Sequence, residues 1–478
     1  MRAQIFRSHR FLAKLLAIPV LFWALSGLMH PFIANWFKPS IANRVLPVVA
    51  VPVNQQWLDP TQLLAKLNIP VIDQIHVASI NERWFYQVIT LEGQHRYFDV
   101  QTGHESSTAE VTLAKELAAA HAGLTTDKII AVEKITEFKE TYRSINRYLP
   151  VYEVQFDTPD KLHVMIDPVT QKLAAFSTRL TRVYRWFFAY AHNWSFFGGP
   201  TDLFRVTLML IVITLVTWVG VAGLYTYVVS RKLANGKKPN RPLYRRMHRF
   251  VGISASILFL MLSLSGVLHI YSKYNFDWGF LEHRTSDISL EELQVALPDV
   301  LLKYDAPVTQ VSLARVGGEP AYRLAISGSA PGEAQYISTR TGNMIENADS
   351  LYAKELAAYF AGVDVSQATG SRLLTEFGKT YPAIMKRLPV QQVRIEGGEY
   401  FGVTVDTAHA HMASRASPSS LFETVVFLNL HKFHFLDNIS KEARDWLSVF
   451  STLLILLTAI LGVNMAIQKR RQKQAYAS

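Results

Sequence analysis

One apolar stretch with a histidine at each end occurs twice, and it constrains the fold of this chain more than any other feature. It reads HRFLAKLLAIPVLFWALSGLMH from His9 to His30 and HRFVGISASILFLMLSLSGVLH from His248 to His269. The two histidines are 21 residues apart in each copy (30 − 9 and 269 − 248). In a straight α-helix this interval spans about 31 Å, roughly the hydrocarbon thickness of a bilayer, and brings both imidazoles to nearly one face. The pattern predicts two membrane-spanning helices that carry histidine at both ends.

The two stretches start 239 residues apart (248 − 9), which is half of the 478 residues of the chain. Other segments keep this spacing: AKELAA at Ala114 and Ala353, TEF at Thr136 and Thr375, TY at Thr141 and Thr380, and LPV at Leu149 and Leu388. A constant spacing predicts a tandem internal duplication whose two copies are related by pseudo-twofold symmetry.

Four apolar stretches are long enough to cross a membrane. They run roughly over Phe11–Phe32, Val206–Val229, Phe250–Ile270 and Trp446–Ile467. The first follows Arg2, Arg7 and Arg10 and contains Pro19 without a small-residue cleavage site, so we expect a retained signal anchor.

The basic residues concentrate at Arg2–Arg10, Arg231–Arg249 and Lys469–Lys473. The positive-inside rule places these segments in the cytoplasm, so the net charge of +11 is no sign of nucleic-acid binding. We expect a multi-pass protein of the bacterial inner membrane, with both termini cytoplasmic and two large periplasmic domains. The predicted order is a cytoplasmic N-terminus with the first span (1–33), a periplasmic domain (34–200), the second span (201–230), a basic cytoplasmic loop (231–247), the third span (248–271), a second periplasmic domain (272–443), the fourth span (444–468) and a cytoplasmic tail (469–478).

The chain has no cysteine, which excludes disulfides, iron–sulfur clusters, thiolate zinc sites and covalently attached c-type haem. Neither a G-x-G-x-x-G motif nor a G-x-x-x-x-G-K-[ST] motif is present, so nothing indicates a nucleotide site.

Both long segments outside the membrane alternate helical patterns with short strands. In the first half we expect helices at Thr61–Leu67 and Val111–Ala122 and strands at Ile75–Ile80, Trp84–Thr90, His95–Val100, Val151–Phe156 and Leu162–Ile166. The strands end in turns such as FDVQTGH, and the second half repeats the order. These helix-and-strand units resemble PepSY domains, two in each half. The predicted fold class is therefore a membrane protein with an α-helical four-span bundle and two α+β, PepSY-like periplasmic domains.

Six of the 15 histidines form pairs at the spacing of 239 residues. The pairs are His9/His248, His30/His269 and His192/His431. A single histidine near a membrane surface is usually an interfacial polar residue, but symmetric pairs at matched depth favour histidines that face the bundle interior and have a function. Two neutral imidazoles from facing helices are the ligands of a six-coordinate haem b, which transfers single electrons. A zinc or copper site is the alternative, but the sequence shows no carboxylate cluster that matches such a site.

Pseudo-symmetry pairs His9 with His248 around one haem iron near the cytoplasmic side. On the other side, His30, His269, His192 and His431 hold one haem or two, and His434 is an alternative to His431. Two haems are therefore expected, or three. Haems at two levels about 31 Å apart would be too distant for direct electron tunnelling. Haem edges that extend inward, a kink at Pro19 or an intermediate carrier would be needed.

A serine and a glycine precede the later histidine of each repeated stretch, as Ser26-Gly27 and Ser265-Gly266. The glycine lies on the helical face of the histidine three residues later. It serves either close packing between helices or the approach of a flat macrocycle.

The chain resembles the PepSY-associated transmembrane family along its whole length, and within that family it is most similar to FoxB-type siderophore reductases. The resemblance rests on the H-R-F starts at His9 and His248, the S-G-x-x-H ends at Ser26 and Ser265, the LHKFHFLD segment at Leu430 and the PepSY-like units. It implies a haem-containing reductase that moves electrons outward to ferric iron in a siderophore, from a cytoplasmic reductant or a quinol, in contact with membrane lipid and without nucleic acid. The alternatives are a PepSY-bearing binding or accessory protein in iron uptake without electron transfer, and a haem reductase for another periplasmic acceptor.

Overall fold

The computed structural model describes residues 2–37, 46, 49–52, 57–139, 141–233, 242–304, 306–329, 332–378 and 381–475. Residues 234–241 of the basic loop expected at 231–247, Thr380 and the last three residues of the expected tail lie outside the described residues. The chain forms two compact units. The first unit comprises Met1–Lys38, Leu180–Phe276 and Ser419–Ser478, and the second comprises Pro39–Arg179 and Asp277–Pro418.

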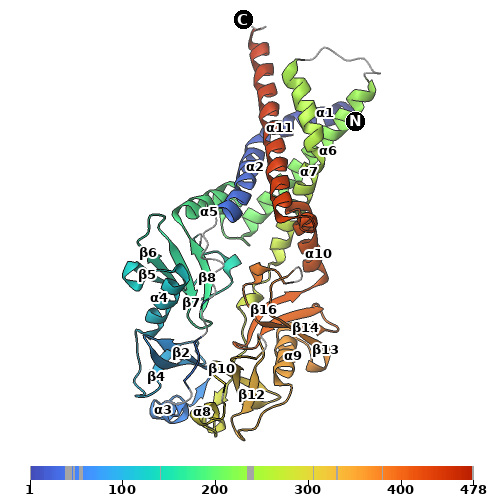
Figure 1. The fold of residues 1–478 in the computed structure, drawn as a ribbon. Coiled ribbons are helices and arrows are strands. Elements are labelled where there is room, and N and C mark those ends of the chain that lie inside the picture. The colour runs from blue at the N-terminus through green and yellow to red at the C-terminus, as the bar shows by residue number, and fades with distance from the viewer. Residues whose placement is uncertain are drawn as a thin grey trace. The chain divides into compact units, whose positions relative to one another are not determined.

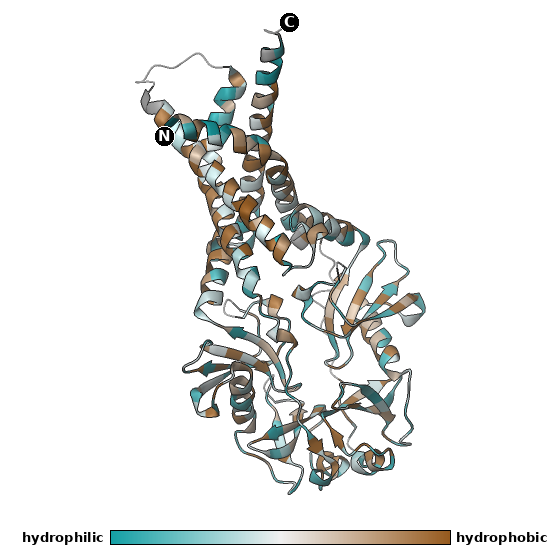
Figure 2. Ribbon diagram, turned by 180° about the vertical axis from the view of Figure 1, so that it is seen from behind, coloured by the Kyte–Doolittle hydropathy of each residue, from teal (hydrophilic) through white to brown (hydrophobic). Residues whose placement is uncertain are grey.

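Three long apolar helices form the centre of the first unit (Figure 1). They are α6 (Leu203–Leu233), α7 (Leu243–Tyr271) and α11 (Lys441–Ala475). Each contains a stretch long and apolar enough to span a membrane, and the apolar residues run along these helices in Figure 2. An α-helix satisfies its backbone hydrogen bonds internally, as a membrane interior requires. The second, third and fourth spans predicted from the sequence correspond to these helices.

The first predicted span is broken. It consists of α1 (Arg2–Leu15) and α2 (Ala17–Pro31), which meet at an angle of 61°. Pro19 explains the break, because proline has no N–H to bond the carbonyl of Leu15 and its ring clashes with that carbonyl. The segment from His9 to His30 is therefore not a straight helix, and the kink at Pro19, one of the alternatives left open by the sequence, is confirmed. The equivalent position in α7 is Leu258 (19 + 239), and α7 continues unbroken from His248 to His269 as predicted.

Small residues allow close contacts between these helices. A Cβ atom at Gly27 in α2 would lie 3.4 Å from Cγ2 of Thr452 in α11, and one at Gly266 in α7 would lie 3.5 Å from Cγ1 of Ile213 in α6. Both glycines thus face a neighbouring helix. The structure favours the helix-packing interpretation of the Ser-Gly pairs.

Shorter helices complete the first unit. The aromatic segment around Tyr184–Trp194 folds mainly as α5 (Arg179–Ala191), and α10 (Pro418–Val426) leads into a π-helical turn at Phe427–His431. A second π-helical turn, Phe32–Trp36, follows α2. These segments bring further histidines to the three long helices.

The second unit contains antiparallel sheets whose strands follow chain order. The first half supplies β2 (Gln74–Ile80), β3 (Arg83–Ile89) and β4 (His95–Asp99), then β5 (Ile129–Ile135), β6 (Val151–Phe156), β7 (His163–Asp167) and β8 (Lys172–Ser177), with α3 (Pro60–Lys66) and α4 (Ala109–Ala122). The second half supplies β10 (Val308–Val316), β11 (Glu319–Ile326) and β12 (Gln335–Ser338), then β13 (Ala368–Leu374), β14 (Val390–Ile395), β15 (Gly402–Asp406) and β16 (His411–Ala416), with α8 (Leu297–Leu301) and α9 (Ala348–Ala361). The helices and strands predicted in the first half are present, to within two residues at their ends. β5 and β8 were not predicted, because these edge strands lack a clear alternation of apolar and polar residues.

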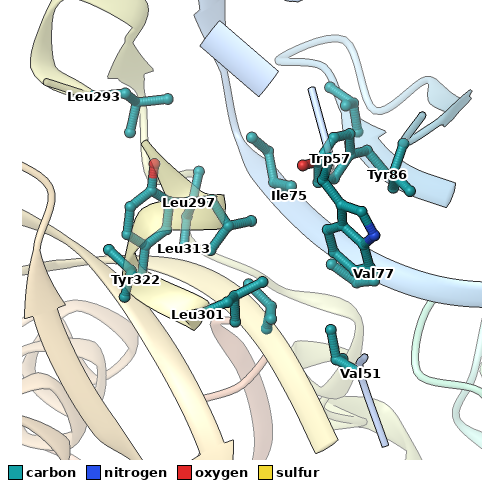
Figure 3. Packing of buried hydrophobic residues seen from close by; sticks show 14 of the residues in the cluster. Val51, Trp57, Ile75, Val77, Tyr86, Leu293, Leu297, Leu301, Leu313 and Tyr322 are labelled. Carbon is teal, nitrogen blue, oxygen red and sulfur yellow. The ribbon is translucent and has the colours of Figure 1, made fainter. Parts of the chain in front are cut away.

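The two halves share one hydrophobic core in the second unit. β1 (Val71–Ile72) pairs with β9 (Ile288–Ser289), and Val51 forms a bridge with Val308. Figure 3 shows Trp57, Ile75 and Tyr86 of the first half packed in the same cluster as Leu297, Leu313 and Tyr322 of the second. The two segments expected as separate domains therefore fold into one compact α+β unit.

Candidate functional site

The histidines at the starts of the two repeated stretches make matching contacts. Nδ1 of His9 in α1 lies 3.0 Å from the carbonyl oxygen of Val219 in α6, and Nδ1 of His248 in α7 lies 3.2 Å from that of Thr458 in α11. Val219 and Thr458 are themselves 239 residues apart (458 − 219). A carbonyl only accepts hydrogen bonds, so Nδ1 carries the proton and Nε2 carries the lone pair in both rings. His9 and His248, which also interact electrostatically, are called the two-histidine group below.

A glycine lies beside each ring of this group. A Cβ atom at Gly223 would lie 3.0 Å from Cε1 of His9, and one at Gly462 would lie 3.5 Å from Cε1 of His248. The missing side chains let each imidazole rest against the backbone of the neighbouring helix. Sequence analysis missed these glycines, although they too are 239 residues apart (462 − 223).

Serines hold the next pair of histidines. Nδ1 of His192 lies 2.9 Å from Oγ of Ser26 in α2, and Nδ1 of His431 lies 3.1 Å from Oγ of Ser265 in α7. Each serine hydroxyl donates its single hydrogen to a backbone carbonyl of its own helix, so its oxygen accepts from the imidazole. The lone pair of each ring is again on Nε2.

The rings of His192 and His431 are neighbours at a spacing that suits two ligands of one metal ion. Their centroids are 6.5 Å apart and their planes are nearly perpendicular, at 88°. Two imidazoles bound through Nε2 to opposite sides of one ion have centroids about 6 Å apart, because metal–nitrogen bonds are about 2 Å long. Phe188 stacks on His192 at 4.4 Å and Phe427 stacks on His431 at 4.8 Å, so an aromatic side chain supports each ring.

The third pair, His30 and His269, lies in the same region with two different partners. Nδ1 of His269 lies 2.6 Å from Oε1 of Glu423 in α10, whereas Nε2 of His30 lies 3.4 Å from Nζ of Lys432. A carboxylate that accepts from Nδ1 is the usual support of a metal-binding histidine. His30, His192, His269 and His431 are called the four-histidine group below. Sequence analysis missed Glu423 and Lys432, whose counterparts at the repeat spacing are Tyr184 and Asn193.

His434, the sequence-based alternative to His431, has other partners. Its Nδ1 lies 2.7 Å from Oδ2 of Asp437 and 3.4 Å from a guanidinium nitrogen of Arg444. The described contacts thus place His431, and not His434, beside His192.

The separation between the two groups depends on which ring of the four-histidine group is considered. This group includes His269 of α7, and His431 contacts α7 at Ser265, which lies 17 residues from His248 (265 − 248). This interval is about 26 Å of unbroken helix, against about 31 Å from His248 to His269. The ring at His431 thus shortens the path by about one helical turn.

Pairs of imidazoles are the donors that these two groups could offer to a metal ion. Within the described ranges, no group of three or more His, Asp or Glu side chains is arranged to hold a metal ion. Zinc usually takes four ligands in a tetrahedron, which two imidazoles do not supply. Two neutral imidazoles with Nδ1 anchored and Nε2 available suit an iron whose other four positions are filled by a macrocycle.

A family model described as PepSY-associated TM region matches residues 6–322, more than half of the chain. The matched range contains five of the six paired histidines, all except His431. A comparison with curated proteins gave no match. The long apolar helices and the α+β unit agree with the family match, and the chain is therefore a multi-pass membrane protein that belongs to the PepSY-associated TM region family.

Proposed function

We propose that this chain is a haem b-containing reductase of the bacterial inner membrane, which moves electrons across the membrane to ferric iron held by a siderophore in the periplasm. In this proposal α1 and α2 together form a fourth span, and the four spans come from two copies of one ancestral half. Both termini lie in the cytoplasm, and the second unit lies in the periplasm.

The observation that carries the proposal is the matched anchoring of imidazoles. His9 and His248 each donate Nδ1–H to a carbonyl, and His192 and His431 each donate it to a serine oxygen. Each bond fixes the tautomer and the ring plane and leaves the Nε2 lone pair for a ligand bond. Four histidines fixed in this way, two at each of two levels, would hold two haems.

Haem held by these histidines would supply one-electron chemistry. The protein's part is to hold the rings, to exclude water with the apolar helices and to place the two levels in line along α7. Reduction of ferric iron weakens its hold in a siderophore, because hard oxygen donors prefer the more highly charged ion. The choice of siderophore iron as acceptor rests on the resemblance to siderophore reductases.

The test is the visible spectrum and haem content of the full-length protein, purified in detergent from cells supplied with haem. We expect a reducible b-type spectrum and two haems per chain. His9→Ala or His248→Ala should remove one haem, and His192→Ala or His431→Ala the other, because each change deletes an axial ligand. His434→Ala is the control and should keep both haems. Reduction of a ferric siderophore after loading with dithionite or a quinol would identify the acceptor and the donor.

A colourless protein would contradict the proposal and leave a binding or accessory protein in iron uptake. A haem protein that reduces another acceptor, but no ferric siderophore, would retain the electron path and reject the substrate. Unchanged haem content in both His9→Ala and His248→Ala would reject the two-histidine group as a ligand pair.

A further inference from the structure

Four histidines that have no histidine partner at the repeat spacing gather in the second unit. They are His76, His283, His409 and His411. The ring centroids of His76 and His409 are 5.2 Å apart, and those of His283 and His411 are 5.3 Å apart. His409 and His411 flank Ala410 at the turn between β15 and β16. The cluster occurs once, because the counterparts of His76 and His409 are Arg315 and Thr170.

His76 and His409 form the buried part of this cluster. Only 3% of His76 and 5% of His409 is exposed. Nδ1 of His76 lies 3.1 Å from the carbonyl oxygen of Val311, and Nδ1 of His409 lies 3.0 Å from Oδ2 of Asp406. Both acceptors require a proton on Nδ1, so each neutral ring carries its lone pair on Nε2.

Neither Nε2 atom has a hydrogen-bond partner among the described residues, and both atoms are buried. A buried polar atom without a hydrogen-bond partner destabilises the folded state. Here two such atoms occur on neighbouring rings, and both are acceptors. Two buried acceptors on neighbouring rings can both be satisfied by one bridging group, such as a metal ion, a shared proton or a water molecule.

The surrounding charges favour an ion of low charge. Arg387 approaches the carboxylate of Asp406, which accepts a hydrogen bond from His409, at 3.5 Å. Lys172 is a second cation that acts on this carboxylate. Each of these two cations repels a divalent ion twice as strongly as it repels a monovalent ion.

We propose that Nε2 of His76 and Nε2 of His409 together bind one Cu(I) ion in a two-coordinate site. Cu(I) is monovalent and accepts two neutral nitrogen donors in a nearly linear arrangement, and imidazole is a common copper ligand. Two rings bound end-on to one ion have centroids about 6 Å apart, so the rings need to separate by about 1 Å. Asp406 behind His409 gives the carboxylate–histidine–metal order that raises the basicity of a ligand.

The test is anaerobic titration of the full-length protein with Cu(I), in competition with a chromogenic Cu(I) chelator. We expect one Cu(I) per chain that is lost, or bound at least about tenfold more weakly, in both His76→Gln and His409→Gln. His163→Gln is the matched control, because Nδ1 of His163 also bonds a carboxylate, Oε1 of Glu153, at 2.9 Å. Subtracting the His76→Gln titration from that of the wild type removes any Cu(I) bound by the first unit.

X-ray absorption of the wild-type protein loaded with one Cu(I) should show two nitrogen ligands, a result that does not depend on how well the variants fold. Three or more ligands would overturn the proposal. Equal loss of Cu(I) in His163→Gln, unchanged affinity in both His76→Gln and His409→Gln, or a proton shared between the two rings in nitrogen-15 NMR of Cu(I)-treated protein would also overturn it. None of these outcomes depends on haem in the first unit.

Discussion

Single hydrogen bonds at Nδ1 decide what the histidines of this chain can bind. The repeat spacing of 239 residues singled out the six paired histidines without any structure. It did not identify their acceptors, because Val219 lies 210 residues from His9 in sequence and is an ordinary apolar helix residue. The acceptor is a backbone carbonyl, which has no signature in the sequence. Which histidines matter was therefore predictable, whereas their tautomers depend on how the helices pack.

Glu110 is a residue on whose charge the second unit depends. Its carboxylate bonds Nδ1 of His95 at 2.6 Å and the hydroxyl of Tyr152 at 2.6 Å, and it pairs with Nζ of Lys134 at 3.1 Å. Burial alone would raise the pKa of Glu110, but these partners lower it from 4.5 to about 2. The folded-state pKa lies below the unfolded value, so the resulting stability is present above pH 4.5 and is lost as the pH falls from 4.5 to about 2.

We expect Glu110→Gln to lower the free energy of unfolding by about 2 kcal/mol at pH 7 and to flatten its decline below pH 4.5. Thermal unfolding of the detergent-purified protein at a series of pH values measures both effects. Glu133→Gln is the control, because Glu133 forms only an exposed ion pair with Lys139 and should change stability by less than about 0.5 kcal/mol. An unchanged pH profile in Glu110→Gln would contradict this role.

Among the elements, a single residue makes the two repeated stretches differ in shape. Pro19 breaks the first into α1 and α2, while α7 runs straight through Leu258. The contacts of the stretches are nevertheless matched, because His9 and His248 reach equivalent carbonyls on α6 and α11. The positions of the helices could be read from apolar length. The direction of the break could not be predicted from the sequence, because it depends on which neighbouring helix packs against α1.

The contact between α2 and α11 at Gly27 controls the position of Ser26. We expect Gly27→Leu to push the two helices apart, since even a Cβ would lie 3.4 Å from Cγ2 of Thr452, and so to remove the acceptor of His192. The melting temperature should fall by several degrees, and any haem bound by the four-histidine group should be lost. Gly199→Leu is the control, because no atom lies within 4 Å of a Cβ added there. A Gly27→Leu protein as stable as the wild type would show that this contact is not tight.

For the molecule as a whole, the second unit joins the two halves of the chain. Its core cluster mixes residues of both halves, and polar contacts cross between them in matching pairs. Arg147 donates to the carbonyl of Ala413 at 2.8 Å, and Lys386 donates to that of Ala174 at 3.2 Å. These two contacts are equivalent at the repeat spacing (386 − 147 and 413 − 174). Neither half can bury this core alone.

We expect a chain cut between α6 and α7 to reassemble when its two halves are produced together, because the shared core and the bundle contacts do not require that connection. Each half alone should aggregate, since it exposes its part of the core. Copurification through a tag on one half, followed by gel filtration in detergent, measures the outcome. A first half that is soluble and monomeric in detergent by itself would contradict the shared-core argument.

Apolar length allowed the membrane helices to be predicted, residue patterns allowed most strands of the first half to be predicted, and the repeat spacing identified the paired histidines. The buried histidine pair at His76 and His409 was not predicted. Both residues lack a histidine at the repeat spacing, and they meet only because β2 packs beside β10 and the β15–β16 turn. A site that occurs once, between segments distant in the chain, produces no repeat in the sequence from which it could be predicted.

Lys432 makes the two halves unequal, because Asn193 stands at the matching position. Its ammonium lies 3.4 Å from Nε2 of His30, and its charge also acts on His192 and His431. Within the proposed function, a fixed positive charge favours the electron-rich state of a neighbouring redox centre and raises its midpoint potential. Electron transfer from the two-histidine group toward the four-histidine group would thereby become energetically favourable. The difference between two otherwise similar halves would come from one lysine.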